Sequence, residues 1–129
     1  MKKVLFTFVI LGNFLLMAEN IDTKKTMQAL EVSMGTIQKG LLYNHRGILK
    51  KGIESLKEEI KNIDSFIIKN DESLNFNAKH YAETEVKALT LLSSKILEDF
   101  DSGKKEDVMI AYEQILNRCV TCHKLIRKW

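Results

Sequence analysis

The spacing of apolar residues constrains this fold more than any other feature of the sequence. In four successive segments, apolar residues recur every three or four positions, a spacing that places one continuous stripe along a single face of an α-helix. The chain contains no proline to interrupt these segments. The sequence therefore predicts an all-α protein built from four amphipathic helices. Their stripes are Met27, Leu30, Met34, Ile37 and Leu41; Leu49, Ile53, Leu56, Ile60, Ile63 and Ile67; Ala82, Val86, Leu89, Ile96 and Phe100; and Val108, Tyr112, Ile115, Cys119, Cys122 and Ile126.

Short polar breaks separate the four segments, over residues 44–47, 69–77 and 101–103. Short connections between helices make sequential neighbours antiparallel. We therefore expect an up-down-up-down four-helix bundle, in which the start of the first helix and the end of the last helix share one end of the bundle. The sequence indicates no linker, second domain or internal repeat.

The N-terminus is typical of a secretory signal peptide. Two lysines precede an apolar run over residues 4–17, and Ala18 then offers a small residue before a cleavage site. We expect a signal peptide over 1–18 and one mature domain over 19–129. Leu16 is large for a position two residues before the cut, so an uncleaved anchor stays open as an alternative.

Charge gives no reason to expect a nucleic-acid partner. Loss of the two signal lysines leaves 18 basic and 17 acidic residues, so the mature chain is close to neutral. About 110 residues then remain, which suits one domain with one small core that gains from a covalently held cofactor.

The most informative chemical motif lies near the C-terminus. Cys119, Cys122 and His123 spell Cys-x-x-Cys-His, the attachment signature of a c-type haem. Each thiol can form a thioether with a haem vinyl group, and the histidine becomes an axial ligand of the iron. These residues lie on the apolar stripe of the fourth segment, so we expect haem c to enter the core near the C-terminal end of the last helix. Attachment takes place outside the bacterial inner membrane, and with the signal peptide this predicts a periplasmic protein.

Other uses of the two cysteines are less consistent with the sequence. A structural zinc site takes four Cys or His ligands, and Cys119 and Cys122 are the only cysteines. A thioredoxin-like dithiol lies in a βαβ context that is absent here. A helical bundle without haem and with a Cys119 to Cys122 disulfide stays open as an alternative.

A C-terminal Cys-x-x-Cys-His on the last helix of a four-helix bundle resembles the cytochrome c′ family, including its low-spin members, and shares its architecture with cytochrome b562. The resemblance covers the mature chain and is most specific over 103–127, which contains the Glu-Gln pair at 113–114, His123, and Arg127 four residues beyond it. Ile126 departs from the pattern, because an aromatic residue often precedes this arginine.

The first segment is similar to the first helix of cytochrome b562, whose leading methionine is the second axial ligand. That resemblance implies that His123 and Met27 both bind the iron, which gives a low-spin centre suited to electron transfer. Met27 is also the first apolar residue of its segment, and antiparallel packing sets it opposite His123. The alternative is that Met27 only fills the core. Met34 lies about 10 Å further along the helix, and we expect it in the core.

Three further positions complete the candidates. His80, near the start of the third segment, is a rival sixth ligand or otherwise a surface residue, and His45 lies in the turn at the opposite end of the bundle. We expect Arg127 to contact a haem propionate or the surroundings of His123, unless it belongs to a solvated basic tail. Candidate walls of the haem pocket are Ile63, Phe66, Phe76 and Tyr81.

The resemblance implies a monohaem electron carrier with no catalytic residues, and therefore no enzyme. Its expected partners are periplasmic redox proteins and the cytochrome c maturation machinery, with a homodimer through the first two helices as a further possibility. The alternative is a five-coordinate cytochrome c′ that binds nitric oxide or carbon monoxide.

Overall fold

A computed structural model describes residues 23–65 and 77–127 of the chain. This part of the chain contains four α-helices, one 3₁₀-helix and no strand, so the prediction of a four-helix, all-α protein is confirmed. The elements are α1 (Thr23–Leu42), α2 (Arg46–Glu59), the 3₁₀-helix η1 (Ile60–Ser65), α3 (Ala78–Asp101) and α4 (Lys105–Arg127).

Several sequence predictions lie outside the described residues. These are the signal peptide over 1–18 with its cleavage site, the pocket-wall candidates Phe66 and Phe76, and the side chains of Ile126 and Arg127. Among the helices that are described, none is long and apolar enough to span a membrane.

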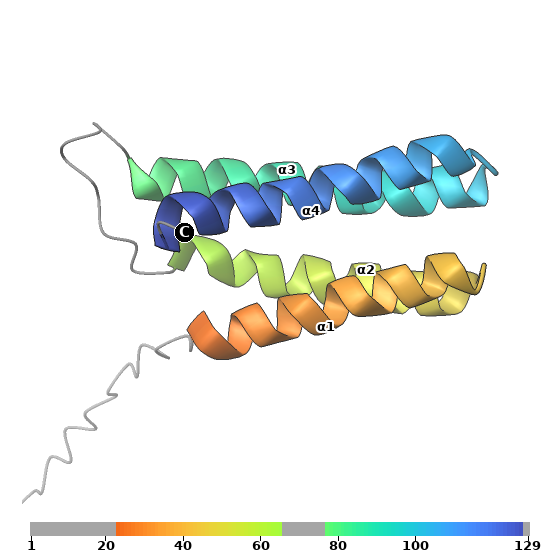
Figure 1. Cartoon of the computed structure of the whole chain (residues 1–129), viewed down its shortest axis with the longest axis horizontal. Helices are drawn as coiled ribbons and strands as arrows, with labels where there is room; N and C mark the ends of the chain where they lie inside the picture. Colours follow the sequence, from red (N-terminus) through yellow and green to blue (C-terminus); the bar gives the residue numbers. More distant parts are fainter. Residues whose placement is uncertain (1–22, 66–76, 128–129) are drawn as a thin grey trace, which may run out of the picture.

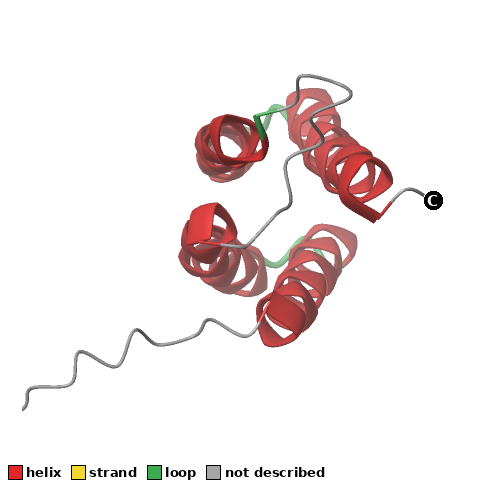
Figure 2. Ribbon diagram, turned by 90° about the vertical axis from the view of Figure 1, so that its left-hand side faces the viewer, coloured by secondary structure: helices red, strands yellow, loops and turns green. Residues whose placement is uncertain are grey.

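The helices pack as two pairs. α1 lies against α2 and α3 lies against α4, and contacts of α3 with α2 and η1 join the pairs (Figure 1). The end-on view in Figure 2 shows the four helices at the corners of a bundle. The α1–α2 and α3–α4 turns lie at one end, whereas the start of α1 and the end of α4 lie at the other (Figure 1). Within the described residues, no Cα atom of α1 comes within 8 Å of a Cα atom of α4, so the backbones of these two helices lie further apart than those of the packed pairs.

The second helix differs from its prediction. The apolar pattern predicts one helix through Ile67, but α2 ends at Glu59 and the chain continues as the 3₁₀-helix η1. A 3₁₀-helix has three residues per turn, so Ile60 and Ile63 fall on the same side and both are buried. The sequence of this stretch is also rich in Asn, Asp and Ser, residue types that are less favourable inside an α-helix.

The core follows the predicted stripes. The largest fully buried apolar side chains are Ile37, Leu49, Leu56, Ile60, Ile96 and Ile115, which come from all four helices and η1. At the end of the bundle that contains the α1–α2 and α3–α4 turns, the turn end, Arg46 connects α2 to α3. Its Nε and Nη2 atoms donate to the two carboxylate oxygens of Asp101, at 2.6 and 2.7 Å. The pKa of the Asp101 carboxyl is lowered because Arg46 donates these bonds to its charged form.

Two glycines allow α1 and α2 to approach closely. A Cβ atom at Gly52 would lie 2.7 Å from the backbone nitrogen of Ile37, and one at Gly40 would lie 2.5 Å from that of Leu49. Real Cβ atoms do not tolerate such distances to backbone atoms. Gly35, also inside α1, faces open space.

We therefore expect Gly52→Ala to destabilise the fold by about 1–3 kcal/mol, since α1 and α2 have to move apart. The matched variant Gly35→Ala should instead stabilise it by up to about 1 kcal/mol, through helix propensity alone. Urea unfolding followed by far-UV circular dichroism measures both. Equal effects of the two substitutions would contradict the close approach of α1 and α2 at Gly52.

Candidate functional site

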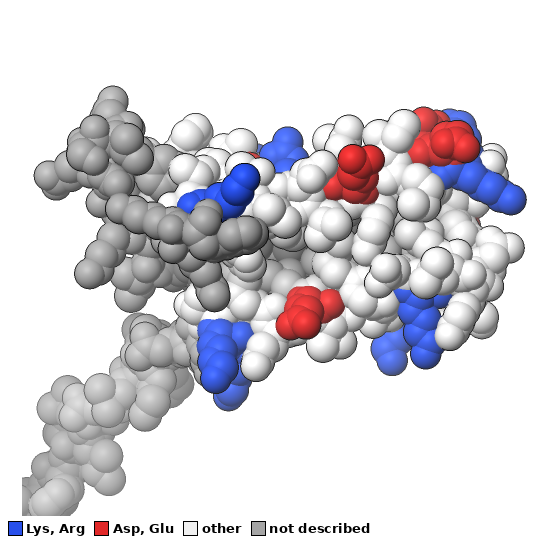
Figure 3. All heavy atoms as spheres, viewed as in Figure 1, with Lys and Arg blue, Asp and Glu red and all other residues white. Residues whose placement is uncertain are grey.

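A cavity of about 390 Å³ opens between α1 and α4 at the end of the bundle where α1 begins. This volume falls within the range of cofactor and small-molecule sites, about 300–1,000 Å³. Its surface is mainly apolar, with Leu30, Met34, Leu56, Ile60 and Leu89 among the residues that line it. Figure 3 shows the hollow on this face and few charged side chains around it.

The cavity brings together four residues that the sequence predicts as the haem site. Met27 lines it from α1, while Cys119, Cys122 and His123 line it from α4. The Nε2 atom of His123 lies 3.5 Å from the Sδ atom of Met27, although 96 positions separate the two residues in the sequence. Their juxtaposition agrees with the expected sharing of one bundle end. Their binding of iron stays a prediction.

The buried stripe of α4 determines which way the side chains of the Cys-x-x-Cys-His motif point. Val108, Ala111 and Ile115 are buried and fix which face of α4 points inward. Cys119 is the next residue of that stripe, and Cys122 and His123 follow it after three and four residues, so all three share a face. Each is half-buried, at the edge between core and cavity. The carboxylates of Glu106 and Asp107 lie in the first turn of α4, where their negative charges interact favourably with the positive end of the helix dipole and stabilise the helix.

Both thiols are protonated over the physiological pH range. Burial raises the pKa of Cys122 to about 11, with a further contribution from the negative charge of Glu85. Burial likewise raises the pKa of Cys119. Because the thiolate is the reactive form of cysteine, the folded chain holds its thiols in a weakly nucleophilic state.

This protonation predicts slow alkylation of the haem-free chain. At pH 8, iodoacetamide should modify Cys122 about a hundredfold more slowly in the folded protein than in urea, because a pKa higher by about two units cuts the thiolate fraction by that factor. Mass spectrometry of timed samples measures the rate, and glutathione in the same buffers corrects for the effect of urea on the reagent. Equal rates in both states would show that the thiols are not buried.

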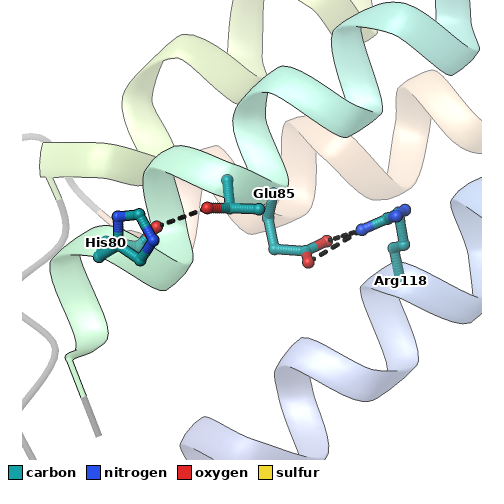
Figure 4. Close-up of polar contacts among 4 residues, drawn as sticks. His80, Glu85 and Arg118 are labelled. Atoms are coloured by element: carbon teal, nitrogen blue, oxygen red, sulfur yellow. Dashed lines mark hydrogen bonds and ion pairs between the residues drawn. The ribbon is translucent and has the colours of Figure 1, made fainter.

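The structure also places in the cavity an ion pair that the sequence analysis did not identify. Arg118 Nη1 lies 3.0 and 3.1 Å from the two carboxylate oxygens of Glu85 (Figure 4). Both residues line the cavity, and Glu85 is buried. One signal was present in the sequence: Glu85 follows Ala82 by three residues and precedes Leu89 by four, so a carboxylate lies on an apolar stripe.

The rival histidines lie away from the cavity. His80 lies in the first turn of α3, five residues before Glu85 (Figure 4). Its side chain is exposed, its backbone N–H donates to the Asn77 side chain at 2.9 Å, and it is not among the residues that line the cavity. His45 caps α2 at the turn end, where its Nδ1 accepts from the backbone N–H of Ile48 at 3.3 Å.

Two of the predicted pocket walls fall within the described residues. Ile63 lines the cavity, whereas Tyr81 is half-buried beside it and is not part of its lining. The pKa of the Tyr81 hydroxyl is raised to about 12, first by burial and then by the charge of Glu85. Tyr81 therefore lies close to the charged part of the cavity without contributing to its apolar surface.

The donor set suits a haem better than a bare metal ion. In the described part of the chain, no group of three or more His, Cys, Asp or Glu side chains is arranged to hold a metal ion. A haem iron needs only one or two protein ligands, because the macrocycle supplies the others. An imidazole, a thioether and two thiols around an apolar cavity therefore fit the chemical requirements of haem c.

No protein-family model, curated protein or solved structure matches this chain.

Proposed function

We propose that this chain is an exported monohaem c-type cytochrome, similar to the cytochrome c′ family, that carries electrons in the periplasm. In this proposal the domain is an up-down-up-down four-helix bundle, with haem c bound covalently through Cys119 and Cys122. His123 and Met27 are its axial ligands. The observation that carries the proposal is the 3.5 Å approach of His123 Nε2 to Met27 Sδ, at the wall of an apolar cavity that both thiols also line.

The residues of the cavity have distinct tasks in this proposal. The bound haem supplies a one-electron couple at its iron. The Met27 thioether favours the ferrous state and raises the reduction potential, while the apolar lining excludes water. Leu116 and Val120, which line the cavity from α4, are 47% and 37% exposed in the chain alone. A bound haem would cover these apolar side chains, which supports a large apolar ligand at this place.

The proposed partners follow from this function. Maturation requires the machinery that attaches haem c, and electron transfer requires periplasmic redox proteins; no catalytic residue, enzymatic reaction or nucleic acid is involved. The contact between Met27 and His123 favours the electron carrier over the five-coordinate cytochrome c′ that binds nitric oxide or carbon monoxide.

The full chain should be produced in a bacterium with an active cytochrome c maturation system. We expect haem in the osmotic-shock fraction, retained through acid-acetone extraction and denaturing electrophoresis, and a low-spin optical spectrum that carbon monoxide changes little. Haem that is extracted from the wild-type protein would contradict covalent attachment. A high-spin protein that binds carbon monoxide readily would favour the gas-binding alternative, and a salt-resistant membrane fraction would favour an uncleaved anchor.

A further inference from the structure

The cavity contains one buried carboxylate that the proposed haem attachment does not use. Glu85, on α3, is 7% exposed, and its carboxylate pairs with Arg118 on α4, the residue directly before Cys119. Burying a carboxylate costs free energy unless a counter-charge and hydrogen bonds compensate it. A charge in this position therefore has a strong local effect on whatever the cavity binds.

The two members of this ion pair differ in how much of each side chain is exposed to solvent. The Glu85 side chain is 9% exposed, whereas the Arg118 side chain is 40% exposed. Both carboxylate oxygens accept from the same nitrogen, Nη1 of Arg118, so the pair lacks the two parallel bonds of the strongest arginine–carboxylate geometry. Solvent screens the arginine more than the carboxylate. The negative charge is therefore only partly cancelled on the cavity side.

Glu85 shares the cavity with the haem-attachment motif. It lines the cavity from α3, and Cys119, Cys122 and His123 line the same cavity from α4. The buried carboxylate is therefore part of the wall that surrounds the proposed haem.

We propose that Glu85 is a fixed negative charge that lowers the reduction potential of the bound haem, with Arg118 as its partial counter-charge. The inference rests on the proposed function. Ferric haem carries one more positive charge than ferrous haem, so a nearby carboxylate stabilises the ferric form, and this effect is stronger in a cavity from which water is excluded. Glu85 thereby offsets part of the increase in potential that Met27 ligation gives.

Two substitutions at the ion pair should move the potential in opposite directions. Glu85→Gln keeps the size of the side chain and removes the charge, and it should favour the ferrous form by about tenfold, a rise of about 59 mV for a one-electron couple. Arg118→Gln leaves the carboxylate without its counter-charge and should lower the potential at pH 8. Spectroelectrochemical titration of the haem protein measures both. A merely structural ion pair predicts shifts of the same sign, because either substitution breaks the same contact.

Two control variants complete this test. Glu31→Gln removes an exposed carboxylate from the rim of the same cavity and should leave the potential nearly unchanged. Arg118→Lys keeps the positive charge and should restore a potential close to that of the wild type.

Three outcomes would overturn the proposal. Unchanged potentials in both Gln variants, shifts of the same sign, or failure of only Glu85→Gln to take up haem would each contradict the charge effect while leaving the haem protein intact. A wild-type chain without covalent haem would instead remove the proposed function, and this inference with it.

Discussion

Replacement of Cys119 and Cys122 together by alanine should reduce haem staining after denaturing electrophoresis to background. No thioether can form in this variant, so only His123, Met27 and apolar contacts remain to hold the cofactor. Haem that still binds should be removed by acid-acetone extraction. The folded state should also lose stability, because a group that binds only the native protein stabilises it and a cavity of about 390 Å³ loses its permanent occupant.

The single variants and one neighbouring residue provide the controls. Cys119→Ala and Cys122→Ala should each retain one thioether and therefore some covalent haem. Thr121→Ala changes an exposed residue inside the same motif and should leave attachment at the wild-type level. Thermal unfolding of the same samples gives the order of stability. Full haem staining in the double alanine variant would refute attachment through these thiols.

The placement of Met27 opposite His123 could be predicted from the sequence because it depends on simple features. The apolar period predicts which face of each helix points inward, and the short polar breaks over 44–47 and 101–103 predict turns that reverse the chain. These features determine which end of the bundle each residue occupies. They do not determine distances, so the 3.5 Å approach of the two side chains required the structure.

Features that depend on the packing of two helices were harder to predict from the sequence. Glu85 looks like an isolated charge on an apolar stripe until Arg118, 33 positions later, is seen to reach it. Gly52 resembles any helical glycine until the backbone of Ile37 is found against it. The change from α2 to η1 was not predicted because Ile60 and Ile63, three residues apart, share a face in either type of helix, so the apolar spacing does not distinguish the two.

Met27→Ala should convert a low-spin haem protein to a high-spin one that binds carbon monoxide. The substitution removes the sulfur atom that lies 3.5 Å from His123 Nε2, and no other methionine takes its place at that end of α1. The weak red charge-transfer band of a sulfur-ligated ferric haem should disappear. The reduction potential should fall, on the order of 100 mV, because the thioether stabilises ferrous iron. Optical spectra with and without carbon monoxide, together with a redox titration, measure these changes.

Met34→Ala is the matched control for this substitution. Met34 lines the same cavity from the same helix, but it lies seven residues or about 10 Å further along α1. Met34→Ala removes a thioether from the cavity wall but no iron ligand. It should therefore keep the low-spin spectrum and mainly lower the stability of the folded protein. His80→Ala should change neither property, because that side chain is exposed in the first turn of α3. If Met34→Ala or His80→Ala abolished the low-spin spectrum while Met27→Ala did not, the sixth ligand would be that residue, and the approach of Met27 to His123 would be a packing contact alone.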